Sequence, residues 1–447
     1  MPSRQDQLQS YQFMVQRVVS ALVMHETDPA QPPFRRAAGA VLAGVLVAAI
    51  ALGGFVAYGA IAGGGGTPWR DSSAVIVERE SGARYVYRDG RLHLVVNYAS
   101  ALLAVGSSRP RTVLVSRRSI EGVPRGSTLG IAEAPDSLPE PGRLLGPPWT
   151  VCALPDAASV MVVGAVSAGG AGLGDRAVLA RHPDGSLHLV WQNHRYLLPD
   201  PALGLTALGW TTARPFGAAP ALLDALPAGA DLAVPRVAGV GERSAHVPAA
   251  RVGEVFVVTS QGGGRQYAVA VRDGLAGITQ VQADLLLTAN RQDRPVELSQ
   301  GRFAAIRKAP DLVPDGLVPT VTPTLVGSFG GALCAVVRDE RGVAEVVVDA
   351  EAPDVADAAR SRSTGGADHV VVPPGRAAVV EAVTAPGGTG GTVSIVTDLG
   401  RRHAVVGTET LAMLGYGGVR PVRLPASVVA LVGAGASLDP ARAREPA

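Results

Sequence analysis

The 447-residue chain contains very little lysine, cysteine or aromatic side chain. Lys308 is its single lysine, beside 39 arginines, so any chemistry that needs a lysine has this residue alone. A P-loop places a lysine directly after a glycine-rich turn, and no glycine run precedes Lys308. Aromatic residues make up 4% of the chain, which leaves few rings to serve as platforms for sugars. These shortages exclude a P-loop and disfavour a glycan-binding surface.

Charged residues make up 17% of the chain and the net charge is +2, so bulk charge gives no reason to expect a nucleic-acid partner. No G-x-S-x-G, H-E-x-x-H or C-x-x-C motif occurs. His182, His188 and His194 lie close together without a second ligand motif, and we expect exposed histidines of one hairpin. The pair Arg401-Arg402 is expected at a solvated strand end. The sequence therefore predicts no catalytic residue, no metal site and no cofactor.

Cys152 and Cys334 are the two cysteines of the chain. A zinc site would need further ligands at suitable spacing, and neither neighbourhood supplies them. In an oxidising compartment an isolated pair is more often joined than free. We therefore predict a disulfide, which would close a loop of roughly 180 residues and could contribute up to about 5 kcal/mol through chain entropy.

An uncharged run from 37 to 62 contains no proline and is long enough to cross the hydrocarbon core of a bilayer as one α-helix. A cleaved signal peptide is disfavoured because 36 patterned residues precede the run and because it is longer than a signal h-region. Arg35 and Arg36 abut its N-terminal end, whereas Gly63 to Gly66 follow its C-terminal end. The positive-inside rule then predicts a single-pass protein of the cell membrane, with residues 1–36 in the cytoplasm and the bulk of the chain outside.

Residues 5–24 carry an apolar stripe with alternating steps of three and four residues. The stripe consists of Leu8, Tyr11, Val15, Val18 and Leu22. This spacing predicts an amphipathic helix, with a break at Asp28 to Pro33 before the membrane. Its polar face has few basic residues, which favours a partner protein over the lipid surface as the binding partner of this head.

The 55 glycines and 34 prolines suit short strands joined by turns. Similar phrases begin near Ala74, Ala177, Gly253 and Gly391. Each reads as an alternating apolar strand, a turn with glycine, a second strand and a short helix rich in Ala and Leu. Because the strand pair cannot bury its apolar face alone, the helix should cover it. We expect four copies of a small α+β unit.

Two stretches that do not fit the repeat each contain one cysteine, and we expect them to form one central, mainly β domain. Repeats one and four would then leave one side of it and repeats two and three the other, which predicts an elongated α+β region. The predicted boundaries are 1–36 cytoplasmic head, 37–62 transmembrane helix, 63–73 Gly-rich linker, 74–146 repeat 1, 147–168 first segment of the central domain, 169–249 repeat 2, 250–319 repeat 3, 320–387 second segment of the central domain, and 388–447 repeat 4 with the C-terminal tail.

The head around Tyr11 to Arg17, the single span, and the phrases SGARYVYRDGRLHLVVNYASALL, RGSTLGI and WTVC resemble the EccB family, component B of the type VII (ESX) secretion systems of actinobacteria. The ordered set covers essentially the whole chain. The resemblance implies a structural subunit of the inner-membrane secretion complex that assembles with EccC, EccD, EccE and the mycosin protease, and with itself in a higher oligomer. It also implies repeats similar to phage-lysin wall-binding modules around a central domain closed by the disulfide.

Two alternatives stay open at this point. ATPase activity is ascribed to members of the family, so an ATP-hydrolysing component without a standard P-loop is one, and ATP would be its cofactor by resemblance alone. A cell-wall-binding anchor is the other.

Overall fold

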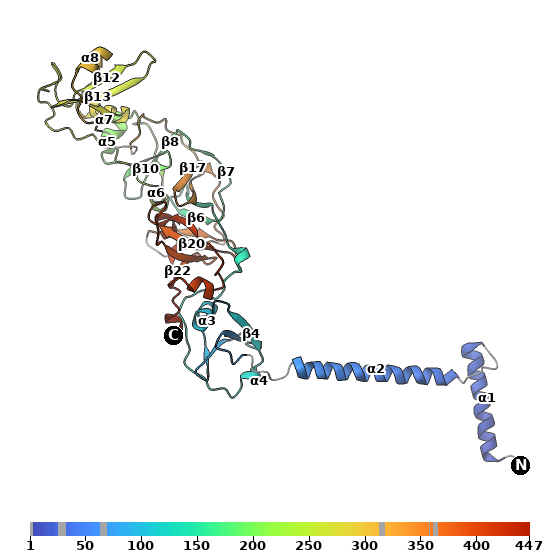
Figure 1. The fold of residues 1–447 in the computed structure, drawn as a ribbon. Helices are drawn as coiled ribbons and strands as arrows, with labels where there is room; N and C mark the ends of the chain where they lie inside the picture. Colours follow the sequence, from blue (N-terminus) through green and yellow to red (C-terminus); the bar gives the residue numbers. More distant parts are fainter. Residues whose placement is uncertain (1–2, 26–32, 63–68, 313–317, 357, 361–364) are drawn as a thin grey trace. The chain divides into compact units, whose positions relative to one another are not determined.

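A computed structural model describes residues 3–25, 33–62, 69–312, 318–356, 358–360 and 365–447 (Figure 1). The chain divides into two compact units, Met1–Pro68 and Trp69–Ala447. The first contains two helices, α1 (Arg4–Met24) and α2 (Pro33–Ala62). His25 ends α1 in a left-handed conformation, with φ of 57°. Most of the predicted helix break, residues 28–32, lies outside the described residues.

The second unit begins with a four-stranded sheet in the order β3-β2-β1-β4. We call residues 69–131 module 1; its elements are β1 (Ala74–Glu78), β2 (Arg84–Arg88), β3 (Arg91–Leu94), α3 (Tyr98–Val105), β4 (Arg111–Val115) and α4 (Arg117–Ile120). Strands β1, β2 and β3 are antiparallel neighbours, and β4 returns parallel to β1. Trp69, which the sequence analysis assigned to the linker, is 2% exposed and packs in the core of this module.

Three further sheets repeat this connectivity. Module 2 (residues 176–232) contains β8 (Ala177–Arg181), β9 (Leu187–Trp191), β10 (His194–Leu198), α5 (Pro201–Ala207), β11 (Phe216–Gly217) and α6 (Pro220–Ala225). Module 3 (residues 250–312) contains β12 (Val255–Thr259), β13 (Arg265–Val271), β14 (Gly274–Ile278), α7 (Gln280–Ala289), β15 (Val296–Leu298) and α8 (Gln300–Ala305). Module 4 (residues 377–438) contains β20 (Ala377–Val383), β21 (Thr392–Thr397), β22 (Arg401–Ala404), α9 (Thr410–Met413), β23 (Val422–Pro425), α10 (Ala426–Ala430) and β24 (Gly433–Ala434). Each module thus has three antiparallel strands before its first helix and a parallel strand after it, where the sequence analysis expected two strands and a helix.

The fourth module begins earlier than the sequence analysis placed it. Strand β20 pairs with β21 and with β23, so it belongs to the sheet of module 4 although it lies within the stretch 320–387 assigned to the central domain. The phrases that begin near Ala74 and Gly391 look equivalent in sequence, but the first starts with β1, the first strand of module 1, and the second starts with β21, the second strand of module 4. Strands β20, β21 and β22 form two consecutive antiparallel hairpins, and side chains alternate with a period of two in both. The sequence pattern therefore does not show which hairpin begins the module, and the predicted start is one strand too late.

A close approach of two backbone segments recurs at the third strand of every module. The amides of Gly126, Gly229, Ala309 and Gly435 donate to the carbonyls of Leu92, Arg195, Leu275 and Arg402, respectively. The next residue of the strand is His93, Tyr196, Ala276 and His403. Where that residue has a ring, the partner is glycine, and a Cβ there would lie 2.1 to 2.4 Å from the ring. Module 3 has alanine at both positions. A ring on the third strand is thus paired with glycine on the facing segment, and an alanine there is paired with alanine.

The central sheet has seven strands in the order β18-β19-β6-β5-β16-β17-β7. They are β5 (Trp149–Ala153), β6 (Ser159–Val163), β7 (Gly169–Gly172), β16 (Ala332–Asp339), β17 (Gly342–Ala350), β18 (Ala359–Arg360) and β19 (His369–Val371). Strand β5 is antiparallel to both β6 and β16, although 182 residues separate its cysteine from that of β16. Modules 2 and 3 are therefore inserted between two neighbouring strands of one sheet. Strand β7, assigned to repeat 2 by the sequence analysis, pairs with β17 in this sheet. Two short 3-10 helices, η1 (Pro141–Arg143) and η2 (Arg442–Arg444), complete the unit.

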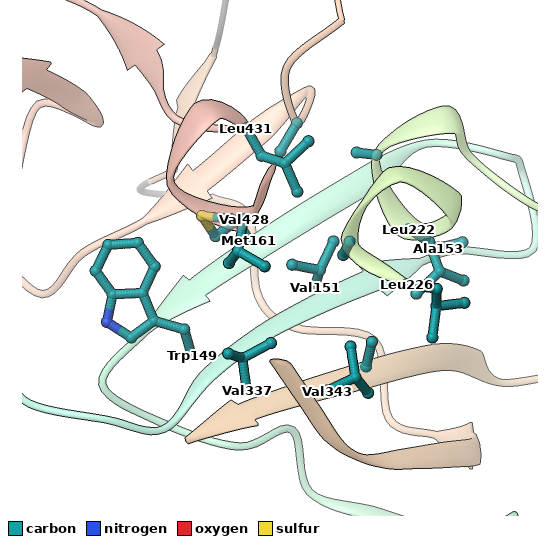
Figure 2. Close-up of a cluster of buried hydrophobic side chains, with 14 of the residues drawn as sticks. Trp149, Val151, Ala153, Met161, Leu222, Leu226, Val337, Val343, Val428 and Leu431 are labelled. Atoms are coloured by element: carbon teal, nitrogen blue, oxygen red, sulfur yellow. The ribbon is translucent and has the colours of Figure 1, made fainter. Parts of the chain in front are cut away.

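Three hydrophobic cores link the five sheets. The central sheet shares its core with modules 2 and 4, whose helices α6 and α10 place Leu222 and Val428 against Val151 and Met161 (Figure 2). A second core joins module 1 to module 4, and a third joins module 2 to α7 of module 3. Modules 1 and 4 therefore share one core, and modules 2 and 3 share another.

Candidate functional site

Helix α1 begins with a reciprocal capping box. The Ser3 backbone amide donates to Asp6 Oδ2 at 3.0 Å, and the Asp6 amide donates to Ser3 Oγ at 3.4 Å. The Ser3 hydroxyl also donates to Asp6 Oδ2 at 2.8 Å, and this hydrogen bond, followed by the one from the Ser3 amide, lowers the pKa of Asp6. The box fixes the helix start, so the periodic stripe that follows has a defined face.

The predicted stripe lies on one side of α1 and is exposed along its length. At 100° per residue its five members fall within an arc of about 80°. Their exposed fractions are 60% for Leu8, 67% for Tyr11, 42% for Val15, 53% for Val18 and 74% for Leu22. Ser20, on the other side of the helix, is fully buried. The stripe is thus an apolar surface without a partner among the described residues of the chain.

Helix α2 has the length and composition of a membrane span over Ala38–Val56, and it is the one such helix in the part of the chain that the structure describes. None of the side chains in this window is buried. Its exposed residues include Leu42, Ile50 and Phe55, which are 75%, 66% and 79% exposed. Apolar side chains exposed all round a helix are typical of contact with lipid.

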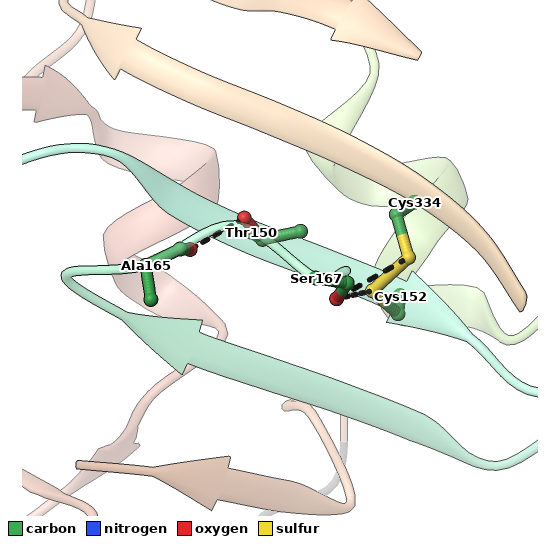
Figure 3. Close-up of a disulfide and its surroundings, with 5 residues drawn as sticks. All are labelled: Thr150, Cys152, Ala165, Ser167 and Cys334. Carbon is green, nitrogen blue, oxygen red and sulfur yellow. Dashed lines mark hydrogen bonds between the residues drawn. A yellow bond between two sulfur atoms is a disulfide. The ribbon is translucent and has the colours of Figure 1, made fainter. Parts of the chain in front are cut away.

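Cys152 of β5 and Cys334 of β16 are directly opposite each other in the central sheet and form a disulfide (Figure 3). Their Cα atoms are 4.0 Å apart, and both residues are at most 1% exposed. The Ser167 hydroxyl oxygen lies 3.3 Å from Cys152 Sγ and 3.8 Å from Cys334 Sγ. Because a disulfide sulfur carries no hydrogen, the Ser167 hydroxyl donates its single hydrogen at this contact, and Cys152 Sγ is the nearer acceptor. The pairing joins the strands on either side of modules 2 and 3.

The side chain of Lys308 is hydrogen-bonded within its own module, module 3. Its ammonium group donates to the carbonyl of Phe303 and, at 2.8 Å, to that of Ile306, and it lies 3.9 Å from the centre of the Phe303 ring. Partial burial lowers the pKa of Lys308. The lysine thus binds carbonyls at the C-terminal end of α8.

The histidines of module 2 differ from expectation at one position. His182 and His194 are partly exposed, but His188 is 9% exposed, so the prediction of an exposed histidine there is wrong. Every residue of β9 is buried because a core covers each face of this strand. Burial is also the main cause that lowers the pKa of His188. No group of three or more His, Cys, Asp and Glu side chains that could hold a metal ion occurs within the described ranges.

The Arg401-Arg402 pair also differs from expectation. Arg401 Nη1 donates to the Ala434 carbonyl at 3.1 Å, and Arg402 Nε donates to that of Val432 at 2.9 Å. Both arginines are half-buried against the closing strand of module 4, where the sequence predicts a solvated strand end. Ser167 and the ring–glycine pairs were missed altogether, because contacts between segments 15 or more residues apart leave no local pattern.

Comparison with known proteins gives matches along the whole chain. A family model described as "Type VII secretion system ESX-1, transport TM domain B" matches residues 1–446. The ESX-2 secretion system ATPase EccB2 of Mycobacterium tuberculosis is 38% identical over 234 residues, which is 49% of this chain and 46% of the relative. In that alignment the chain spans about half the length of the relative. The ESX-3 secretion system ATPase EccB3 of Mycolicibacterium smegmatis is 27% identical over 467 residues, covering 97% of this chain and 88% of the relative.

Two solved structures resemble the fold. One, a chain of an intact ESX-5 inner membrane complex, has a TM-score of 0.64 and 26% identity, and the likeness covers 100% of this chain and 96% of that chain. The other, from an EccB3 dimer of the ESX-3 core complex, has a TM-score of 0.66 and 26% identity over 83% of this chain and 99% of that chain. With a family match that extends from the first residue to 446, the chain belongs to the EccB family of type VII secretion systems.

Proposed function

We propose that this chain is a membrane-anchored structural subunit of a type VII secretion complex in the inner membrane. The observation that carries the proposal is the likeness to a chain of an intact ESX-5 inner membrane complex, which includes the helical unit as well as the modules. Helix α2 supplies the anchor, and the modules supply a large surface for assembly.

The proposed orientation places the N-terminal head in the cytoplasm. Arg35 and Arg36 precede the apolar window of α2, and no arginine or lysine follows that window before Arg70. Positive charge is retained on the cytoplasmic side of single spans. The modules would then lie outside, in agreement with a related structure described as a periplasmic assembly from the ESX-5 complex.

The proposed partners are the other membrane subunits of the system, namely EccC, EccD, EccE and the mycosin protease, together with further copies of this chain. The EccB3 structure contains a dimer and the ESX-5 structure is a C3 composite, so related chains occur in several copies in one complex. The exposed stripe of α1 is the surface that we assign to contacts on the cytoplasmic side.

Purification from detergent-solubilised membranes tests the proposal. The full chain should be recovered together with other type VII membrane subunits, identified by mass spectrometry, in a particle several times its own mass. A matched control carries a changed anchor, Leu46→Arg and Ile50→Arg, which places two charges in the window at a cost of about 2.5 to 3.5 kcal/mol each. Recovery of the unchanged chain alone, from membranes in which the other subunits are present, would contradict a structural role in the complex.

ATP hydrolysis is the second candidate, favoured by the names of the ESX-2 and ESX-3 relatives, which are called ATPases. The position of Lys308 supports the scaffold instead, because its ammonium group is already bound to two carbonyls of its own module. If the chain hydrolyses ATP through this lysine, Lys308→Ala in the purified protein should lower the rate at least about tenfold. A rate above background that Lys308→Ala reduces would favour the enzyme.

A further inference from the structure

The apolar stripe of α1 has the spacing of a coiled-coil seam. Steps of three, four, three and four residues place Leu8, Val15 and Leu22 at heptad position a and Tyr11 and Val18 at position d. All five lie within one continuous helix and are exposed. Arg4 would occupy the preceding d position, so the seam begins at Leu8.

The positions that flank this seam carry no charge. The g positions are Gln7, Met14 and Ala21, and the e positions are Gln12 and Val19. The charged residues that follow Arg4 in α1 are Asp6 and Arg17, which fall at positions f and c on the outer side. In coiled coils, e and g charges determine which partners attract and which repel. Two identical copies of α1 therefore meet no like-charge repulsion along the seam.

Membrane anchoring favours a parallel arrangement of two such helices. If two copies of the chain occupy one complex, as the proposed function requires, their α2 helices hold both heads on the same side of the bilayer. A tether of this kind raises the effective concentration of the second helix. This compensates for the weak association expected of a seam that has only three apolar a positions.

We propose that α1 packs against α1 of a second copy of this chain in a parallel coiled coil through Leu8, Tyr11, Val15, Val18 and Leu22. The inference rests on the proposed function, because it needs two anchored copies in one assembly. In this proposal the exposed stripe is covered by α1 of a second copy. The alternative is that a groove on a different subunit covers it.

Cysteine crosslinking of the full chain in membranes tests this pairing directly. The two native cysteines are joined to each other, so neither supplies a background thiol. A cysteine at the seam, Val15→Cys or Val18→Cys, should give a covalent dimer at least about tenfold faster than one on the outer side, Gln9→Cys or Gln16→Cys. Because the seam is uncharged, the rate should be the same at low and high salt.

A second pair of variants separates pairing from mere proximity. Val18→Asp added to Val15→Cys should abolish the covalent dimer, whereas Gln9→Asp added to Val15→Cys should leave it intact. Equal dimer yield from seam and outer cysteines, or a covalent adduct of Val15→Cys with a different subunit in place of the dimer, would overturn the pairing. Co-purification of other secretion subunits would still support the proposed function in that case, so the two failures are distinguishable.

Discussion

The pairing of a ring with a glycine in three of the four modules leads to a sharp prediction at Gly126. Its Cβ, if present, would lie 2.1 Å from His93 Cε1, so Gly126→Ala forces the imidazole to move. Displacements of this kind cost about 1 to 3 kcal/mol, and the stiffer unfolded chain of the alanine variant returns about 0.4 to 1 kcal/mol. We expect a net loss of about 1 to 2 kcal/mol in the stability of module 1.

The compensating variant follows from module 3, where Ala276 and Ala309 occupy the equivalent positions. In His93→Ala/Gly126→Ala the clash is absent, and the remaining loss is the hydrogen bond from His93 Nδ1 to the Ser127 carbonyl, 2.9 Å in length and worth about 1 kcal/mol. The double variant should therefore be more stable than the sum of the two single changes by about 1 to 2 kcal/mol.

Native-state hydrogen exchange of the full chain measures this locally, in peptides that cover residues 91–96 and 125–131. Gly126→Ala should exchange about tenfold faster there, and the double variant should recover most of the protection. Gly142→Ala is the matched control, because a Cβ at Gly142 meets nothing within 4 Å. Protection in Gly126→Ala equal to that in the control would refute the steric argument.

Three further predictions concern the disulfide, a buried tyrosine and the lysine. Cys152→Ser removes a cross-link that closes 182 residues and should lower the melting temperature while freeing one titratable thiol at Cys334; two thiols in the unreduced parent protein would contradict the pairing. Burial raises the pKa of Tyr416 to about 12, so stability should fall by up to about 3 kcal/mol between pH 10 and 12 and Tyr416→Phe should flatten that part of a calorimetric pH series. The same Tyr416→Phe leaves the Pro139 carbonyl, now bound at 2.7 Å, without its donor, at a cost of about 1 to 3 kcal/mol at neutral pH. Lys308→Ala should leave any measured ATP hydrolysis unchanged while loosening the end of α8, which hydrogen exchange would report; a loss of hydrolysis would favour the enzyme.

Hydrophobic periodicity predicted the elements that have a solvent-exposed face or a uniformly apolar surface. The stripe of α1, the apolar run of α2, and the paired strands around each glycine turn each have one exposed or uniform surface, which leaves a clear pattern in the sequence. The position of the cysteines in two non-repeating stretches likewise indicated one sheet, and the structure joins them in neighbouring strands.

Hydrophobic periodicity is absent from strands that are buried on both faces and from very short strands. Strand β9 is buried on both faces, so His188 lies in a run with no alternation, and nothing local marks it as interior. The parallel strands β11 and β15 are two and three residues long and follow a helix, which is too short for a period to appear. Module 4 was misplaced because two consecutive hairpins look alike, and only the pairing of β20 with β23 identifies the first strand.

The nesting of the modules has a consequence for synthesis. Module 1 shares its core with residues of module 4, including Tyr416, and with Ala443 beyond it, so a ribosome that has made residues 69–131 has not yet made what closes that core. The core between module 2 and α7 of module 3 comes from one contiguous stretch and can form while β5 still waits for β16, whereas the face of module 2 that packs on the central sheet closes later. We therefore expect the core between module 2 and α7 to form first and the core between modules 1 and 4 last, so that a truncated product would leave the apolar surface of module 1 exposed.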